Sequence, residues 1–334
     1  MNASADNSAA ARRIIAGGVV WEGCVGWTVE CLPFTDGVLQ KYRDAGFNHV
    51  SLTIAAEWNG VESAMRHLGR IRNWLAAQSD HITIISTADD IDAARAAGKL
   101  AVSFNFQGSG PFANDPNLIE VYARLGVKIV ILNYNSRNAL GDGCQEPGNG
   151  GLSMLGQRFV QELNRVGVLI DLSHVGERTA METIVASRDP VLISHSNPHA
   201  LHAHARNVSD AMIRACAAKG GVIGLNSLSF MLDDSGRSTV PRFVAHIEHV
   251  VALAGPLHVG LGMDWNFYDP FMQAMYAQNP AMKALGYPAP PWDSLAPDRL
   301  PEIVEALLAR GWSDAHVHGL LGGNLMRVAR PIWR

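Results

Sequence analysis

The stretch from Gly156 to His174, GQRFVQELNRVGVLIDLSH, decides the fold because it carries the chain from a helix directly into a buried strand. An amphipathic helical pattern covers Leu152–Val166, and an apolar run, Val168–His174, follows it. Short apolar runs alternate with helix-length segments along most of the chain, as expected of βα units around a parallel sheet. With 334 residues, 48% of them hydrophobic and 17% charged, the chain suits a single (β/α)8 TIM-like barrel with insertions, although two smaller domains also fit this length.

Strands and helices can be assigned from this alternation. The expected strands are Ile14–Val20, His49–Ile54, Ile82–Ser86, Leu100–Phe106, Lys128–Tyr134, Val168–His174, Val191–His195, Val222–Asn226 and His258–Met263. The expected helices include Pro116–Leu125, Leu152–Val166, Glu177–Ser187, Ser209–Lys219, Val240–Ala254, Arg299–Arg310 and Ala315–Val328. The nine strand candidates slightly overfill an eight-stranded barrel.

Composition separates a short tail and an insertion from the rest of the barrel. Residues 1–12 are polar and rich in Ala and Ser, so we expect a disordered tail before a single barrel domain over residues 13–334. Residues 266–296 are rich in Pro, Met and aromatic side chains, and they follow a strand. We therefore expect a structured insertion over the barrel mouth rather than a linker.

Charge, cysteine content and hydropathy limit the partners and the location. The formal net charge is -4 and Lys and Arg are scattered, which argues against nucleic acid or an acidic membrane surface and favours a small-molecule substrate. The cysteines have no zinc-finger spacing and are interpreted as reduced thiols: Cys24, Cys31, Cys144 and Cys216. The start of the chain does not have the pattern of an apolar leader, and no stretch reaches membrane-spanning length, so we expect a cytoplasmic protein. The apolar insertion is compatible with a homodimer.

Three of the expected strands end on side chains that can do chemistry. Two runs end on the imidazoles of His174 and His195, and a third ends on the carboxylate of Asp264. Reactive residues of a parallel barrel stand at the carboxyl ends of its strands, where neighbouring imidazoles can share a metal ion and a carboxylate can bind metal or move a proton. A single His at a strand end is more often a hydrogen-bonded structural residue, but three converging ends favour an active site.

A polar segment beyond His195 adds a candidate substrate grip. The planar guanidinium of Arg206 suits a substrate carboxylate, and Asn207 beside it is a second candidate for substrate binding. Three further imidazoles lie in the same segment, but each is interpreted as a solvent-facing side chain: His199, His202 and His204.

These motifs resemble the renal (membrane) dipeptidase family, peptidase family M19, of the amidohydrolase superfamily. The similarity runs in order from about Leu100 to the C-terminus and rests on the stretch ending at His174, Ile193-Ser-His-Ser196, Arg206-Asn-Val208, Gly260-Leu-Gly-Met-Asp264 and Gly323-Asn-Leu-Met-Arg-Val328. The resemblance implies a barrel whose two zinc ions activate a bridging water to hydrolyse dipeptides. It also implies that His174 and His195 bind one zinc, that Arg206 binds the substrate carboxylate, and that Asp264 handles the proton.

The family pattern is altered elsewhere in the chain. The first strand of the family ends Asp-Gly-His-Asn-Asp and supplies two ligands of the other zinc, whereas the matching segment here is Glu22-Gly-Cys24-Val25-Gly26. The bridging Glu of the family falls on Gln107, and a His after the fifth strand falls on Tyr134. Because two negative charges that would offset two zinc ions are lost, the sequence does not favour a full two-metal site.

Three functions compete on this sequence. The first is a dipeptidase-like metallohydrolase with one zinc ion at most, bound by His174 and His195 with help from Cys24, Gln107, Asp264 or water, which acts on a dipeptide or related small amide carrying a carboxylate. The second is a repurposed metal-independent lyase, isomerase or condensing enzyme. It would use Tyr134 for proton transfer, or Cys24 as a nucleophile whose thiolate neighbouring imidazoles favour. The third is a non-catalytic binder of small carboxylates that holds no metal.

Overall fold

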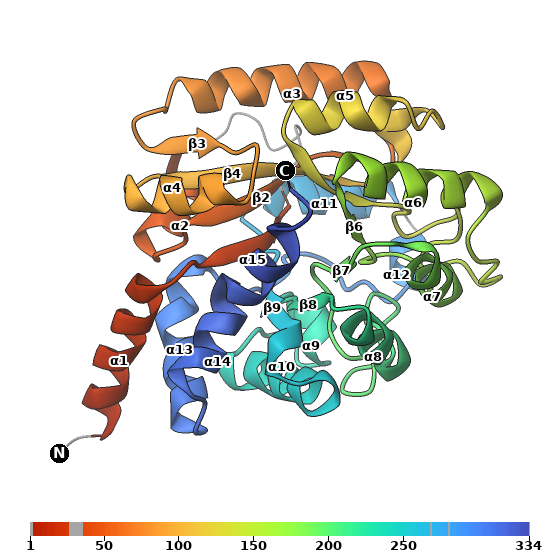
Figure 1. Ribbon diagram of the computed structural model, residues 1–334. Coiled ribbons are helices and arrows are strands. Elements are labelled where there is room, and N and C mark those ends of the chain that lie inside the picture. Colours follow the sequence, from red (N-terminus) through yellow and green to blue (C-terminus); the bar gives the residue numbers. More distant parts are fainter. Residues whose placement is uncertain (1–2, 27–35, 268, 280, 334) are drawn as a thin grey trace.

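The computed structural model describes residues 3–26, 36–267, 269–279 and 281–333 and forms a nearly closed parallel barrel surrounded by helices (Figure 1). The strands are β1 Trp21–Val25, β2 His49–Ala56, β3 Ile82–Ile84, β4 Leu100–Gln107, β5 Val127–Ile131, β6 Leu169–Asp171, β7 Leu192–Ile193, β8 Val222–Leu225 and β9 Val259–Leu261. The helices are α1 Ala3–Gly17, α2 Asp36–Asp44, α3 Val61–Ala76, α4 Asp89–Ala96, α5 Leu118–Arg124, α6 Met154–Val166, α7 Glu177–Ala186, α8 Asp210–Ala218, α9 Ser229–Leu232, α10 Val240–Ala254, α11 Asp269–Gln278, α12 Ala281–Ala284, α13 Leu300–Ala309, α14 Asp314–His318 and α15 Asn324–Ala329.

The barrel consists of parallel strands in the order β1-β2-β4-β5-β6-β7-β8-β9. The remaining described strand, β3, pairs with the first residues of β4, where Ile82 lies opposite Leu100. Pairing of β4 with β5 begins only further along, at Phe104 and Val127. The fold is therefore the expected (β/α)8 TIM-like barrel, and β3 accounts for the ninth candidate strand.

The N-terminal segment differs from the prediction, because α1 covers Ala3–Gly17 where a disordered tail and a strand over Ile14–Val20 were expected. Alanine is the strongest helix former, and this segment is rich in it. Ala11, Ile14 and Ile15 are buried, and their spacing places them on one helical face. That face packs beside α13, so the first strand starts later, at Trp21.

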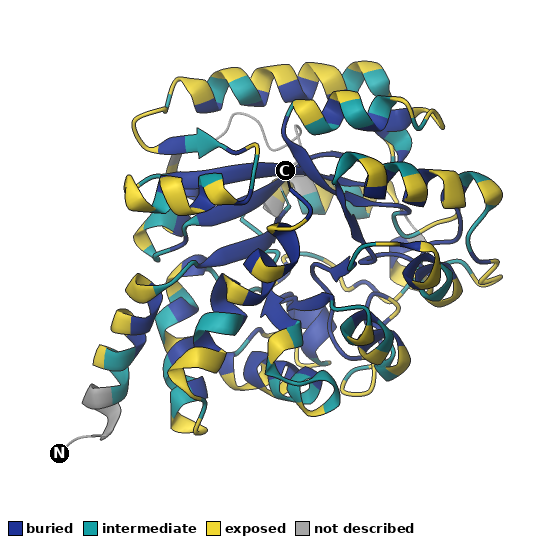
Figure 2. Ribbon diagram, in the orientation of Figure 1, coloured by how far each residue is buried: buried dark blue, intermediate teal, exposed yellow. Residues whose placement is uncertain are grey.

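One end of the barrel is sealed by the C-terminal segment. Trp21 inside the barrel lies against Trp333, with ring centroids 5.1 Å apart, and α15 covers this end. His49 in the same layer bonds to the Ser103 hydroxyl at 3.0 Å, and burial lowers the pKa of His49 to about 3. Figure 2 shows the barrel strands in the dark blue of buried residues, whereas β3 is partly of intermediate burial. The chemistry is therefore confined to the opposite end, where the strands finish.

Glycine allows the strands to approach closely near β7. An ideal Cβ at Gly262 would lie 1.7 Å from the Ser194 carbonyl oxygen, and one at Gly224 would lie 2.0 Å from it. Because any side chain at these two positions would clash with backbone, the Ser194 carbonyl can enter the space between the strands only where glycines face it. The end of β7, and with it His195, is placed by this contact.

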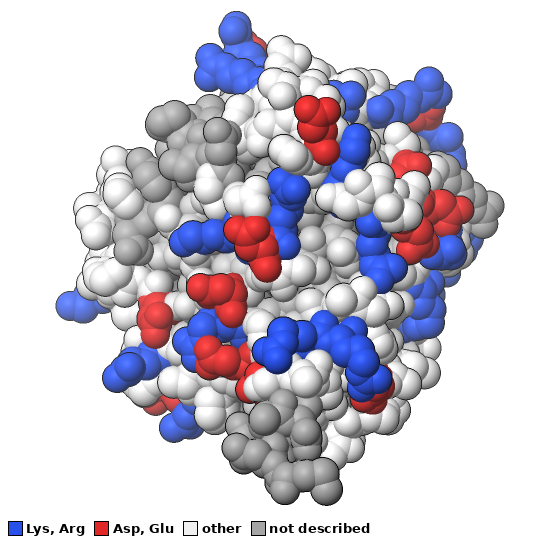
Figure 3. Space-filling model, turned by 90° about the vertical axis from the view of Figure 1, so that its left-hand side faces the viewer, with Lys and Arg blue, Asp and Glu red and all other residues white. Residues whose placement is uncertain are grey.

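The surface carries charges of both signs, and the described cysteines are free thiols. Figure 3 shows Lys and Arg interspersed with Asp and Glu on the face it presents. Among the helices described, none has both the length and the apolar character needed to span a bilayer. Cys24, Cys144 and Cys216 are free thiols, and Cys31 lies outside the described residues.

Candidate active site

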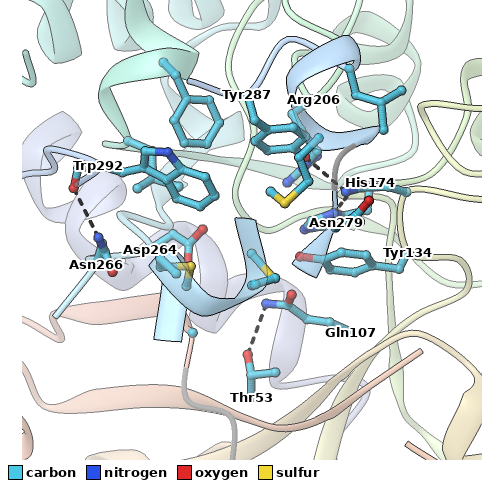
Figure 4. Close-up of a pocket in the computed structure, with 18 of the residues that line it drawn as sticks. Thr53, Gln107, Tyr134, His174, Arg206, Asp264, Asn266, Asn279, Tyr287 and Trp292 are labelled. Carbon is cyan, nitrogen blue, oxygen red and sulfur yellow. Dashed lines mark hydrogen bonds between the residues drawn. The ribbon is translucent and has the colours of Figure 1, made fainter. Parts of the chain in front are cut away.

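A cavity of about 980 Å³ opens at the carboxyl ends of the strands. Side chains that follow the strands line its floor, including Gln107, Tyr134, His174 and Asp264, and Arg206 from the loop after β7 lies beside Tyr287 (Figure 4). Residues of α11, α12 and the segment that follows them line the other side. The predicted insertion, residues 266–296, thus contributes cavity wall.

Two of the strand-end residues adopt a backbone conformation that is unusual for their type. His174 has φ 67° and Asp264 has φ 50°, in the left-handed region that favours glycine. Such residues cost about 1–3 kcal/mol each and persist where the surrounding contacts fix them, which occurs most often at functional sites. The strain is therefore located at two of the three residues that the sequence singled out.

His174 and His195 face each other through their Nε2 atoms, which are 3.0 Å apart. The Nδ1 atom of His174 lies 2.7 Å from the Asn135 side-chain oxygen, and the Nδ1 atom of His195 lies 2.6 Å from the Ser194 hydroxyl. An amide oxygen only accepts, so the proton of neutral His174 is on Nδ1. Its Nε2 atom therefore presents a lone pair to His195.

The proton of His195 is placed by a buried carboxylate behind it. Asp171 accepts the Ser194 hydroxyl hydrogen and the backbone N–H groups of Ser173 and Ser194, the latter two at 2.9 Å. With its own hydrogen given to Asp171, the Ser194 hydroxyl accepts from Nδ1 of His195. Both Nε2 atoms consequently carry lone pairs, and burial followed by the charge of Arg206 lowers the pKa of each imidazole well below its ordinary value.

Arg206 supplies a positive charge at the same wall of the cavity. Its guanidinium is buried, and it donates to the His195 carbonyl oxygen at 3.3 Å and to the Ser196 hydroxyl at 3.4 Å. These bonds hold the guanidinium beside the two imidazoles while it lines the cavity. A substrate carboxylate in the cavity could therefore meet a fixed guanidinium.

The end of β1 forms a different cluster with β2 and β4. The Gln107 amide nitrogen donates to the Cys24 sulfur at 3.2 Å and to the Thr53 hydroxyl at 3.1 Å, and Cys24 lies 3.9 Å from an Asp264 oxygen. Burial, followed by the charges of Asp264 and Glu22, raises the pKa of the Cys24 thiol well above its ordinary value. The expectation that imidazoles favour a thiolate here was wrong, because these neighbours are carboxylates, a hydroxyl and an amide.

Asp264 closes the cluster on the cavity side. Its second oxygen accepts from the Asn226 amide nitrogen at 3.2 Å. Burial raises the pKa of Asp264, and the charge of Arg206 opposes that rise as the largest lowering contribution. A carboxyl whose pKa is raised suits a group that takes up and returns a proton.

Tyr134 covers the imidazole of His174. The Tyr134 and His174 rings are stacked with centroids 4.0 Å apart. The Trp58 ring meets the Tyr134 ring edge-on, with centroids 5.4 Å apart. Burial raises the pKa of Tyr134 well above its ordinary value, so the phenol stays neutral and can donate a hydrogen bond into the cavity.

Not every predicted site residue lines the cavity. Asn207 is buried, and its amide nitrogen donates to the carbonyl oxygens of His202 and Met231, so its role is to hold the loop rather than to contact substrate. His204 was expected to face water, yet it is buried against Phe230 and Tyr287.

Sequence reasoning missed residues that support the site from behind. Asn135, Ser194 and Asp171 fix the imidazoles, and Trp58 stands at the cavity wall. Asp171 lies on the buried strand that leads to His174, and a carboxylate in such a run was a signal for a buried polar network. Asn135 follows the fifth strand with no such signal.

The donor atoms fit one metal ion better than two. Two nitrogens on a tetrahedral zinc at about 2.0–2.1 Å lie about 3.4 Å apart, close to the 3.0 Å between the Nε2 atoms of His174 and His195. The Cys24 cluster offers a thiol, an amide and one carboxylate, and these are bonded to one another. Across the part of the chain that the structure describes, no three His, Cys, Asp or Glu side chains are grouped so as to hold a metal ion by themselves.

Comparison with known proteins finds relatives that are named as dipeptidases. The sequence profile of the membrane dipeptidase family, peptidase family M19, matches residues 35–277. Dipeptidase tcpJ of Claviceps purpurea is 30% identical over 275 residues, which are 81% of this chain and 60% of that protein. The chain spans 51% to 66% of the length of four curated relatives that it matches.

Solved structures share the barrel over nearly its full length. An amidohydrolase from Pseudomonas aeruginosa has a TM-score of 0.86 and 28% identity, covering 97% of this chain and 99% of that one. A metallo peptidase from Rhodobacter sphaeroides, solved with a phosphinate mimic of the dipeptide L-Ala-D-Ala, has a TM-score of 0.78 and 19% identity, covering 94% and 99%. The second likeness concerns the fold alone.

Proposed function

Since this chain belongs to the membrane dipeptidase family, peptidase family M19, we propose that it is a metal-dependent hydrolase that cleaves a dipeptide or a related small amide carrying a carboxylate. His174 and His195 would hold one zinc ion, which would supply Lewis acidity to the reaction. The family site holds two zinc ions, so this proposal is for a reduced site.

A single observation carries the proposal: the Nε2 atoms of His174 and His195 lie 3.0 Å apart, and the partners of the two Nδ1 atoms assign a lone pair to each Nε2. Two such lone pairs repel unless a cation lies between them. A proton is disfavoured there because burial and the nearby charge of Arg206 lower the pKa of both imidazoles. Hydrogen bonds from the other nitrogen of each ring are the supports that metal-binding histidines ordinarily have.

The rest of the cavity floor supplies what a hydrolase needs. Bound zinc contributes Lewis acidity, which polarises a carbonyl and makes water a stronger acid at neutral pH. Arg206 holds the substrate carboxylate and fixes the amide over the floor. As water adds to the carbonyl carbon and the carbon–nitrogen bond breaks, Asp264 takes a proton from the water and returns it to the leaving amine.

The second zinc position of the family is not supported by this chain. An ideal Cβ at Gly26 would lie 3.0 Å from an Asp264 oxygen, so a carboxylate at position 26 would stand beside Asp264. Position 26 is glycine, and the side chains of Cys24 and Gln107 are neutral. Burial raises the pKa of Glu22 behind Cys24 to about 8, so Asp264 is the remaining ionised carboxylate of this cluster at neutral pH. Too little negative charge remains to offset a second dication.

A metal-independent enzyme is the second candidate, favoured by the way Cys24, Gln107 and Thr53 satisfy one another without an ion. The raised pKa of Cys24 counts against this thiol as its nucleophile. Tyr134 and Asp264 would then carry the proton transfers.

Amino-acid release from dipeptides by the purified full chain separates the two candidates. The proposal predicts hydrolysis that is lost on exhaustive chelation and restored by about one equivalent of zinc per chain. Full activity on the substrate after chelation would support the metal-independent enzyme instead. A chain that stays inactive towards dipeptides with added zinc would contradict the proposed function.

A further inference from the structure

We propose that the substrate of this site carries a bulky apolar side chain in addition to its carboxylate, and that the insertion is the surface that selects it. This inference rests on the proposed function, because it names the substrate class of the same cavity. The two sides of the cavity differ in chemistry, and that difference points to a two-part ligand.

The apolar roof, as we call it, is a set of six cavity-lining side chains: Phe230, Met272, Met275, Met282, Leu285 and Trp292. Asp264 lines the cavity at the strand-end floor, and Arg206, from the loop after β7, lines it beside Tyr287 (Figure 4). Glu57, the other carboxylate in the lining, follows β2 and accepts from the Ser109 backbone N–H at 3.0 Å. Gln278 and Asn279 of the insertion also line the cavity, but the described part of the insertion contributes no charged side chain to the lining, so a charged substrate side chain against the six roof residues would lose its hydration without an ionic partner.

Part of the roof is rigid. The Phe230 ring lies 4.9 Å from Trp292 and 5.3 Å from Tyr287, and the indole N–H of Trp292 donates to the Pro288 carbonyl oxygen at 2.9 Å. Figure 4 shows Trp292 and Tyr287 on the side of the cavity away from Gln107 and Thr53. These bonds and contacts fix an aromatic wall.

The wall is tied to the reactive centre. The Tyr287 hydroxyl accepts from the Asn135 amide nitrogen at 3.0 Å, and the oxygen of the same amide bonds Nδ1 of His174 at 2.7 Å. One amide therefore connects Tyr287 of the aromatic wall to the imidazole pair. A ligand held by Arg206 would place its side chain against a surface whose position is set relative to His174.

The other part of the roof is adaptable. Met272 and Met275 on α11 are half-buried and line the cavity. Thioether side chains are flexible and polarisable, so they adjust to apolar groups of different shape. The cavity of about 980 Å³ stands at the upper end of the range of roughly 300–1,000 Å³ for small-molecule sites. Two small residues would leave much of it, and most of the roof, without contact.

Equilibrium binding to non-cleavable ligands tests the inference on the full chain. We would titrate ketomethylene analogues of Gly-Gly, Phe-Gly and Gly-Phe, in which a CH2 group replaces the amide N–H, by calorimetry. At least one Phe analogue should bind about tenfold or more tightly than the Gly-Gly analogue, because burial of an aromatic side chain contributes that much. Equal binding of all three analogues would overturn the inference.

Two variants test whether Met272 and Met275 cause the preference for the Phe analogues. The double variant Met272→Gln, Met275→Gln keeps side-chain length and should reduce the preference to less than about threefold. Met154→Gln is the control, because Met154 is 85% exposed on α6, away from the cavity lining. Thermal unfolding of both variants checks that they fold. A preference that survives the double variant unchanged would assign the selection to another surface.

The outcomes for ligand class and for hydrolysis are separable. Preferential binding of a Phe analogue by a chain that cleaves no dipeptide would contradict the proposed function and support the ligand class. Cleavage of dipeptides with no preference in binding would support the proposed function and contradict the ligand class.

Discussion

The ends of β6 and β7 and the ends of β1 and β4 lie at the same mouth of the barrel, yet they have opposite chemistry. At β6 and β7, His174 and His195 turn lone pairs towards each other, and Asp171 fixes the proton of one ring through Ser194. At β1 and β4, Cys24 and Gln107 donate and accept among themselves. In the proposed function a cation completes the first region, whereas the side chains of the second region satisfy one another without an ion.

This difference shows what determines whether a strand end can bind metal. Ligand atoms must be free of other partners, and the groups behind them must hold the correct tautomer. The β6 and β7 ends meet both conditions. In the β1 and β4 ends the amide nitrogen of Gln107 is turned towards Cys24 and Thr53, and a donor group cannot bind a cation.

Removal of an imidazole should produce the largest effect. His195→Ala takes away one of two proposed ligands and should lower kcat/KM by at least about a thousandfold, roughly 4 kcal/mol of transition-state stabilisation. Cys24→Ser should change kcat/KM by less than about threefold. Steady-state kinetics of the two variants, with thermal unfolding to verify folding, compare the two regions directly. A larger loss in Cys24→Ser than in His195→Ala would reverse the assignment of the active region.

Glu22, on β1 below Cys24, should make stability depend on pH. Burial raises the pKa of its carboxyl from 4.5 to about 8, so the folded chain binds this proton more tightly than the unfolded chain. The stabilisation is full below pH 4.5 and is lost as pH rises towards 8, by up to about 4 kcal/mol between pH 5 and pH 8. Glu22→Gln should remove this contribution, so the fall in urea-unfolding free energy between pH 5 and pH 8 should be smaller in the variant. An identical fall in both proteins would contradict the buried, protonated carboxyl.

Arg206→Lys should weaken substrate binding more than turnover. An ammonium group cannot form the paired bonds of a guanidinium with a carboxylate, so we expect KM to rise on the order of 100-fold. A substrate analogue whose carboxylate is replaced by a carboxamide should lose little further affinity in the variant. Unchanged KM in Arg206→Lys would place the carboxylate elsewhere in the cavity.

Asp171→Asn should weaken metal binding without removing a ligand. The variant loses the carboxylate that accepts from Ser194, so Nδ1 of His195 is held less firmly as a donor. Partners of this kind change metal affinity by about 10- to 100-fold. Competition with a zinc-binding dye measures the affinity, and Asp142→Asn, at a buried carboxylate bonded to Arg137, is a matched control. Equal zinc affinity in Asp171→Asn and the wild type would remove Asp171 from this role.

Much of the fold and part of the site could be predicted from sequence. Buried parallel strands are apolar runs, and helices between them repeat with a different period, so the barrel and the strand ends at His174, His195 and Asp264 were accessible. The start was predicted wrongly because Ile14 and Ile15 are apolar neighbours that suit a strand as well as the buried face of α1. Local composition could not decide between the two.

The roles of the supporting residues were not accessible, because they depend on contacts between distant segments, although Asp171 in a buried strand signalled a polar network. Asn135 meets His174 from 39 positions away, and Asp171 meets Ser194 from 23 positions away. Whether Cys24 is a thiolate also depends on burial and on Asp264, 240 positions distant. Sequence predicted the residue types at the site, whereas the proton positions required the three-dimensional arrangement.

The metal content of the purified full chain tests the central claim most directly. Mass spectrometry of the wild type after equilibration with excess zinc and removal of free ions should give about one zinc per chain, and His174→Ala should give none. Cys24→Ser should retain the single ion. Two zinc ions in the wild type, or one that persists in His174→Ala and is lost in Cys24→Ser, would contradict the account.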